Sequence, residues 1–256
     1  SARYGFRPAF LLCFAVMALV IPFGILFRDS FRDAAIVSES AQHHTTDRES
    51  IVAILILLPV AMLFFCAFYQ TGTSLTLFAK NNTQPALLGI PLAPPVYQSI
   101  HPALVLVLTP ILVRFFRRWP MTTWKKLSLG MGFCSLSCLV MMDASVVASF
   151  ASSHGRVSPL WLIGSYTLLS IAELCVSPLG FSLVSKISPP KFAGLLMGMW
   201  MAAIALGNLA TGFLGILWER WSHAAFFGLL TGLSALAIPL LWTQRRRLDR
   251  VLGARP

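Results

Sequence analysis

The sequence predicts an all-α membrane protein that crosses the bilayer several times, and three observations support this prediction. Hydrophobic residues make up 57% of the 256 residues, whereas charged residues make up only 11%. A soluble domain usually carries about 25% charged residues. The apolar residues form long runs rather than the alternating pattern of a membrane barrel strand. Such a chain cannot cover a water-facing surface, so lipid is the solvent that suits it.

Seven runs are long enough to span a hydrocarbon core of about 30 Å, which requires around 20 helical residues. They cover residues 8–27, 51–79, 97–116, 125–149, 159–185, 191–217 and 223–243. Residues 28–50 hold more than half of the nine acidic residues, which indicates a polar linker. The predicted organisation is therefore one helix in residues 1–27, a linker, a six-helix bundle over residues 51–243, and a basic tail over residues 244–256.

The formal net charge of +11 indicates membrane topology rather than nucleic-acid binding, because lysine and arginine lie in short clusters between the apolar runs. Most of the 20 basic residues fall in the linker, in the tail, and in the loops that the alternation of spans places on the same side of the membrane as the linker. The positive-inside rule then places the linker and the C-terminus in the cytoplasm. A chain that starts outside at Ser1 is expected to be part of a longer protein. A signal anchor at Arg3 and Arg7 is the alternative, but it would break the alternation of the later loops.

The sequence predicts no metal site, cofactor or enzymatic centre. The five cysteines lie inside apolar runs without metal-ligand spacing, so we interpret them as small buried hydrophobic residues. His43 and His44 fall in the linker, where a solvated pair is the simpler interpretation. No HExxH motif, aspartate pair or Ser–His arrangement lies at depth, which argues against an intramembrane hydrolase.

Two acidic residues fall inside predicted spans, where an ionisable group usually has a function. Asp143 lies near the end of its span, and an interfacial position explains it. Glu173 lies near the middle of the span that starts at Pro159. Burial favours the protonated carboxyl, whereas a bound ammonium group favours the charged form, so Glu173 could exchange a proton for a substrate amine. A structural glutamate is the alternative, and the sequence offers no evident cationic partner for it within the spans.

The residues around Glu173 favour a substrate site. Ser177 lies four residues further on and therefore shares a helical face with Glu173. Pro178 removes a backbone donor and is expected to bend or loosen the helix just after that face, and transporters place substrate sites at broken helices. An ordinary proline kink is the alternative interpretation.

Other spans also carry unusual residues. Residues 68–75 and 97–102 are rich in polar side chains, which need a cavity or a neighbouring helix. The sixth run has small residues at Gly194, Gly198 and Ala202, a spacing that predicts a close helix contact. Trp200 in the same run is either a core residue or an aromatic ring that faces substrate.

These motifs, taken in order, resemble the second half of the proton-dependent oligopeptide transporter family of the major facilitator superfamily. The resemblance covers nearly the whole chain, and its opening residues 4–10 are similar to the start of that family's sixth helix. The stretches that carry it are Tyr69–Leu75, Tyr97–Pro102, Glu173–Gly180, Pro189–Lys191 and Met197–Trp200. It implies a C-terminal six-helix bundle preceded by the last helix of the N-terminal bundle.

The resemblance also implies roles for individual residues. Glu173 matches the carboxylate that receives the peptide's amino group and takes part in proton coupling, and Ser177 matches its neighbour in the pocket. Trp200 matches an aromatic residue at the edge of the site. Tyr69 stands where most members have an acid, just before the motif glutamine at Gln70, which leaves gating by that acid in doubt. His101 stands where the family usually has an asparagine, and it could titrate.

The implied function is proton-coupled import of di- and tripeptides across the cytoplasmic membrane, without enzymatic activity. The basic groups that hold a peptide's carboxylate belong to the family's N-terminal half, so that half-bundle is an expected partner beside peptide, protons and lipid. Two alternatives remain open at this point. One is a related transporter of another small amine-bearing solute, and the other is a seven-helix receptor.

Overall fold

The computed structural model describes residues 10, 11, 14, 15, 17, 18, 22, 47–87, 89–150 and 155–251. By its internal contacts the chain divides between Gln42 and His43, and the helices described below belong to the second unit. Most of the first predicted span, the pair His43 and His44, and the linker before residue 47 lie outside the described residues.

Six of the described helical segments are long and apolar enough to cross a membrane. The first consists of α3 (Asp47–Phe68), a 3-10 turn η1 (Tyr69–Gly72) and α4 (Ser74–Asn81). The other five correspond to the remaining predicted runs, and η2 (Pro190–Phe192) leads into the fourth of these. They are α5 (Pro94–Arg118), α6 (Thr123–Phe150), α7 (Leu160–Ile187), α8 (Ala193–Arg220) and α9 (His223–Thr243). The predicted multi-pass helical fold is therefore confirmed for this part of the chain.

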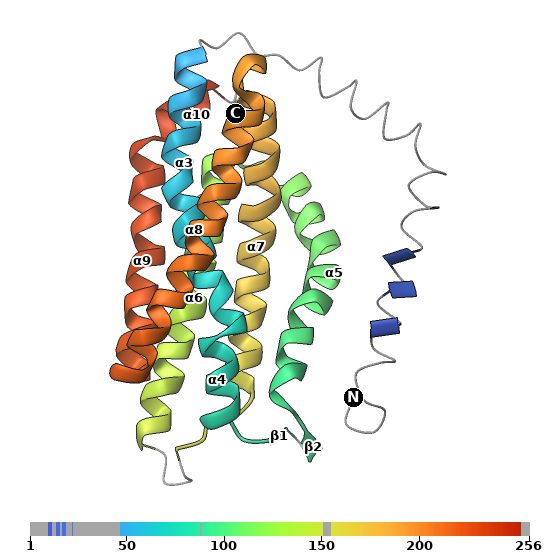
Figure 1. Ribbon diagram of the computed structural model, residues 1–256, viewed down its shortest axis with the longest axis vertical. Coiled ribbons are helices and arrows are strands. Elements are labelled where there is room, and N and C mark those ends of the chain that lie inside the picture. The colour runs from blue at the N-terminus through green and yellow to red at the C-terminus, as the bar shows by residue number, and fades with distance from the viewer. Residues whose placement is uncertain are drawn as a thin grey trace. The chain divides into compact units, whose positions relative to one another are not determined.

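The long helices run side by side along the longest axis of the molecule (Figure 1). α6 packs mainly against α7 and α9, and α3 packs mainly against α8. α5 packs mainly against α7 and buries only Tyr97 of its own residues. The core between the other helices is aromatic and aliphatic, with Phe64, Tyr166 and Phe226 almost fully buried. α5 is thus a peripheral helix that reaches the bundle through α7.

Local sequence explains where several helices begin. Pro94 and Pro95 occupy the first positions of α5, where a missing backbone donor costs nothing. Ser222 caps α9, because its hydroxyl oxygen accepts a hydrogen bond from the backbone N–H of Ala225 at 3.2 Å. A small hairpin of β1 (Ala86–Leu87) and β2 (Ile90–Pro91) joins α4 to α5. Gly89 at its turn has φ of 81°, a conformation that favours glycine.

Part of the predicted basic tail is helical. α10 (Arg245–Val251) contacts α3 and α6, and Leu248 is 1% exposed in this contact. Arg250 forms an exposed ion pair with Glu49 at 3.7 Å. This contact places the start of α3 and the end of α10 at the same end of the bundle, as the predicted topology requires.

The small residues of α8 that make its close contact are not the predicted ones. A Cβ atom built on Gly194 or Gly198 would meet nothing within 4 Å among the described residues, and Ala202 is exposed. A Cβ atom on Gly207 would instead lie 2.7 Å from the carbonyl oxygen of Met62 on α3. The prediction of a packing seam at Gly194, Gly198 and Ala202 was therefore wrong within this bundle, since those residues lie on the outer face of α8.

Candidate functional site

The polar stretch after α3 interrupts a membrane-spanning helix. Gln70 is 1% exposed, and its Oε1 accepts hydrogen bonds from the hydroxyls of Thr73 at 3.0 Å and Ser74 at 2.7 Å. The Tyr166 hydroxyl on α7 donates to the backbone oxygen of Thr71 at 3.3 Å. Side chains thus provide hydrogen-bond partners for polar groups around the interruption, which would otherwise be unpaired in an apolar core. The sequence predicted one continuous helix over 51–79, so this interruption is a correction.

The helix that carries Glu173 is continuous. α7 extends to Ile187, nine residues beyond Pro178, and the proline itself is exposed. The helix is therefore not broken at Pro178, and the alternative interpretation of an ordinary proline kink remains. A proline on the outer face leaves a single unsatisfied carbonyl, which a long helix packed on several neighbours tolerates. The interruption at η1 lies between α3 and α4, whereas the acidic residue Glu173 lies on α7.

The carboxyl group of Glu173 contacts a histidine from the neighbouring helix. Its Oε2 lies 2.9 Å from Nε2 of His101, which α5 brings alongside α7. The side chain of Glu173 is 26% exposed and that of His101 is 16% exposed. Sequence reasoning found no partner for Glu173, because only the packing of α5 on α7 brings these two positions together. The spacing of polar residues at the start of α5 was the one signal that could have indicated it.

His101 is held by two further contacts. Its Nδ1 lies 2.7 Å from the hydroxyl oxygen of Ser170, which in turn donates to the backbone oxygen of Tyr166 at 2.8 Å. The ring of Phe68, the last residue of α3, meets the imidazole edge to face with centroids 5.3 Å apart. Both ring nitrogens of His101 therefore have partners on α7, and one ring face is covered by the residue next to η1. Ser170 was not predicted as a site residue.

The remaining predicted residues differ in how deeply they are buried. Ser177 is half-buried one turn beyond Glu173 on α7, and Tyr69 packs on Phe68 with ring centroids 5.6 Å apart. Trp200 is 2% exposed and lies directly against Gly180 of α7. Its Nε1 has no hydrogen-bond partner among the described residues.

The structure thus brings His101 and Glu173 into contact, with Ser177 one turn further along α7 and Tyr69 beside Phe68, whose ring contacts His101. Gln70 faces the bundle core instead, beside residues of α6 and α9. Asp143 is exposed on α6, in agreement with the interfacial interpretation.

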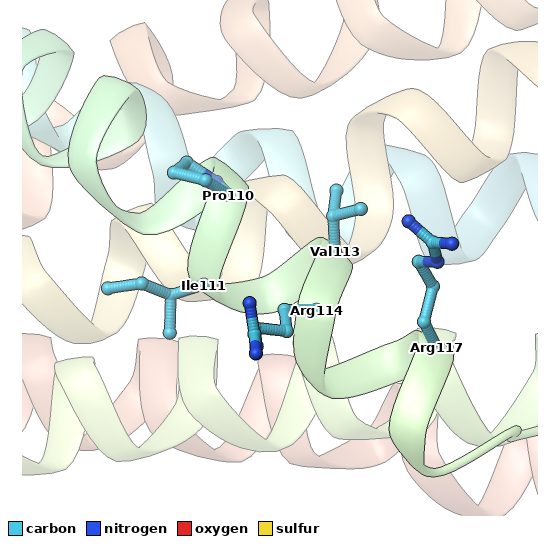
Figure 2. A pocket seen from close by; sticks show the side chains of 5 residues that line it. All are labelled: Pro110, Ile111, Val113, Arg114 and Arg117. Atoms are coloured by element: carbon cyan, nitrogen blue, oxygen red, sulfur yellow. The ribbon is translucent and has the colours of Figure 1, made fainter.

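A separate hollow lies further along α5 (Figure 2). Five residues of α5 alone line it: Pro110, Ile111, Val113, Arg114 and Arg117. It starts nine residues beyond His101, which corresponds to about 13 Å along a helix. None of the predicted site residues lines it, so this hollow is a surface feature of the exposed helix and is distinct from the Glu173 site.

Ionisable side chains that meet between two spanning helices, close to an interrupted third helix, are typical of membrane transporters. The POT family model matches residues 24–226, which is most of the chain. The chain belongs to the POT family.

Similar proteins agree with this assignment. The chain is 36% identical over 204 residues to dipeptide and tripeptide permease A of Escherichia coli (strain K12), an alignment that covers 78% of the chain. It is 33% identical over 177 residues, or 66% of the chain, to the peptide transporter YePEPT of Yersinia enterocolitica. A crystal structure of a mutant peptide transporter POT in complex with alafosfalin superimposes with a TM-score of 0.71 at 26% identity, over 98% of the chain.

The chain is much shorter than these relatives. It spans 38% of the length of the Escherichia coli permease, 34% of the Yersinia transporter and 52% of the POT crystal structure. The relatives are transporters rather than enzymes, and the receptor alternative has no support from them.

Proposed function

We propose that this chain supplies the C-terminal half of a proton-coupled transporter that imports di- and tripeptides by alternating access. The observation that carries the proposal is Glu173, a carboxylate within a spanning helix that is paired with His101 and still 26% exposed. An ionisable group at this depth is costly unless it has a role, and its residual exposure leaves an edge that a ligand could reach. The family and the names of the relatives support peptide as the cargo.

Each predicted site residue has a proposed role. Glu173 receives the peptide's amino group and takes part in proton coupling, and Ser177, Tyr69 and His101 line the same side of the bundle. Gln70 and Trp200 are only 1% and 2% exposed, so we propose that they support the elements that form the substrate site. Gln70 does so by holding the interruption at η1, and Trp200 by filling the space beside Gly180.

The proposal includes a partner and an orientation. A dipeptide carries a charge at each end, and this site offers only the acidic counter-charge, so an N-terminal half-bundle is needed to bind the carboxylate. We place the protein in the cytoplasmic membrane with its C-terminus in the cytoplasm, because lysine and arginine concentrate on that side. The contact of α10 with the start of α3 supports a shared location for the C-terminus and the linker.

Uptake of a labelled dipeptide into proteoliposomes tests the proposed cargo. The chain is joined to or co-expressed with an N-terminal half-bundle, and uptake is driven by a proton gradient directed inward. We expect unlabelled di- and tripeptides to compete and free amino acids not to compete. Equal competition by amino acids would favour the transporter of another small amine-bearing solute, and uptake unaffected by collapse of the gradient would contradict proton coupling.

A further inference from the structure

We propose that the end of α9 and the arginines of α10 form a binding site for the headgroup of an anionic phospholipid. The site consists of three consecutive arginines, Arg245, Arg246 and Arg247, and the exposed ring of Trp242. Its ligand is a phosphodiester group at the membrane surface, as in phosphatidylglycerol. The site shares no element with the Glu173 site, and it does not rest on the proposed transport of peptides.

The position of Trp242 sets the depth of the site in the membrane. α9 contains 21 residues, which corresponds to about 30 Å, the thickness of a hydrocarbon core. Trp242 lies in its last turn and is 54% exposed. Exposed tryptophans at the end of a span typically lie at the level of the lipid headgroups. α10 begins at Arg245, three residues after Trp242, so its arginines start at that level.

The guanidinium group of Arg245 is held at the same level by the tryptophan ring. Its Cζ lies 4.4 Å from the centroid of the Trp242 ring, and the side chain is half-buried. A cation over an indole face is attracted by the negative charge density of the ring, and more strongly where water is partly excluded. A cation fixed beside an interfacial tryptophan lies where a lipid phosphate lies.

Contacts on the other side of α10 determine how this helix lies. α10 contacts the bundle at α3 and α6, with Leu248 1% exposed, and Arg250 pairs with Glu49 of α3 at 3.7 Å. Arg246 lies two residues before Leu248, about 200° around the helix, so it points away from the bundle and is exposed. Among the described residues, none of the three arginines of the site forms an ion pair. Their charges are therefore available to an anion.

α6 adds further positive charge at this end of the bundle, which we place in the cytoplasm. It contacts both α9 and α10, and Lys125 and Lys126 lie in its first turn. Each lysine lies over an aromatic ring, Lys125 over Trp124 at 5.7 Å and Lys126 over Phe116 at 4.9 Å from the centroid. With Arg245 and Trp242, all three cation–aromatic contacts of the described residues are at this end.

A phospholipid headgroup suits these groups for two reasons. Guanidinium groups form paired hydrogen bonds with phosphate oxygens, so binding here depends on side chains and not on the backbone of the short α10. The acyl chains of a lipid also hold its phosphate at the depth of Trp242, so the anion need not be taken from dilute solution. Each basic residue near an anionic membrane surface contributes about fivefold in affinity, and three together about a hundredfold.

Quenching of tryptophan fluorescence by brominated lipids tests the site in the purified chain. The chain is reconstituted in phosphatidylcholine bilayers with a rising fraction of brominated phosphatidylglycerol, and in a parallel series with brominated phosphatidylcholine. The Trp242 signal is the difference between native protein and Trp242→Phe. We expect its half-maximal quenching at a fraction of phosphatidylglycerol about tenfold to a hundredfold lower than that of phosphatidylcholine. Equal quenching by the two lipids would overturn the site, since a topology signal alone predicts no preference.

Combined substitution of the three arginines tests the assignment to these residues. Arg245→Gln, Arg246→Gln and Arg247→Gln together should abolish the preference for phosphatidylglycerol, and a preference that survives would overturn the assignment. Arg220→Gln is the matched control. Arg220 is also exposed in the last turn of a spanning helix, beside the 46% exposed Trp221, but at the opposite end of the bundle. This control should keep the native preference.

A charge-preserving variant shows whether the loss is electrostatic or structural. Lysine at the same three positions keeps the positive charges and should keep most of the preference. A loss as large as in the glutamine variant would overturn the electrostatic site.

Excess inorganic phosphate separates a lipid from a free anion as the ligand. We expect phosphate to leave the quenching by brominated phosphatidylglycerol unchanged, and full reversal by phosphate would overturn the lipid site. None of these measurements involves a dipeptide, so failure of the lipid site and failure of the proposed transport function are distinguishable.

Discussion

Replacing Gly180 with alanine is expected to destabilise the bundle, because Trp200 fills the space that the new methyl group needs. A Cβ atom on Gly180 would lie 2.2 Å from Cζ2 and 2.5 Å from Cη2 of the indole, where ordinary contacts are 3.4–4 Å. The ring would have to move by more than an ångström, yet it is 2% exposed and has little free space. Overpacking of this kind costs about 1–3 kcal/mol. Gly→Ala within a helix regains about 0.5–1 kcal/mol, so the net loss should be about 1–2 kcal/mol.

Thermal unfolding in detergent, followed by fluorescence-detected size exclusion, measures this loss. A change of 1 kcal/mol corresponds to a shift of about 2–4 °C for a chain of this size. Gly164→Ala is the matched control, because Gly164 also lies in α7 and a Cβ there would meet nothing within 4 Å. It should leave the midpoint unchanged or raise it slightly.

A second substitution tests whether the indole is the cause. Phenylalanine at position 200 lacks the outer ring atoms that clash, so Gly180→Ala combined with Trp200→Phe should lose less stability than the two separate effects predict. Equal midpoints for Gly180→Ala and Gly164→Ala would refute the reasoning, and strict additivity in the double variant would show that the indole is not the obstacle.

Three further substitutions have expected outcomes. Gly207→Ala should lower the unfolding midpoint more than Gly212→Ala, since its Cβ would lie 2.7 Å from backbone and that of Gly212 meets nothing; equal midpoints would contradict the packing of α8 on α3. Gln70→Leu leaves the buried hydroxyl of Ser74 without its acceptor and should cost about 1–3 kcal/mol of unfolding free energy in denaturant titration, whereas a neutral effect would show that this hydroxyl finds another acceptor. Arg250→Ala removes an exposed ion pair and should change the midpoint by less than about 1 kcal/mol, and a larger loss would mean that this contact does more than tie two helix ends together.

The predictable part of the fold was set by hydrophobic run length. The helices from α5 to α9 follow from apolar stretches bounded by prolines, polar residues and basic clusters, and these signals are local. The interruption at η1 was missed because the polar side chains of residues 68–75 were attributed to a cavity or a neighbouring helix rather than to a break in the helix. At Pro178 the helix continues, because a proline inside a long helix removes only one backbone donor and need not end the helix.

The candidate site was predictable only as far as single residues could indicate it. Glu173 was singled out because an acid in an apolar span is costly, whatever its neighbours are. Its pairing with His101, 72 positions away in the sequence, depends on how α5 lies against α7, and no local pattern encodes that contact. The contact of Ser170 with His101 could not be predicted for the same reason, since only the packing of α5 on α7 brings the serine hydroxyl next to the imidazole.

The transport account depends on the carboxyl of Glu173, and gradient-driven dipeptide uptake by the Glu173→Gln variant tests it most directly. The variant keeps the size and hydrogen-bonding capacity of the side chain but cannot carry a negative charge or exchange a proton. We expect native protein to accumulate dipeptide under an inward proton gradient and the variant, present at the same level and equally stable, to show none of this accumulation. Accumulation that persists in Glu173→Gln would contradict the account.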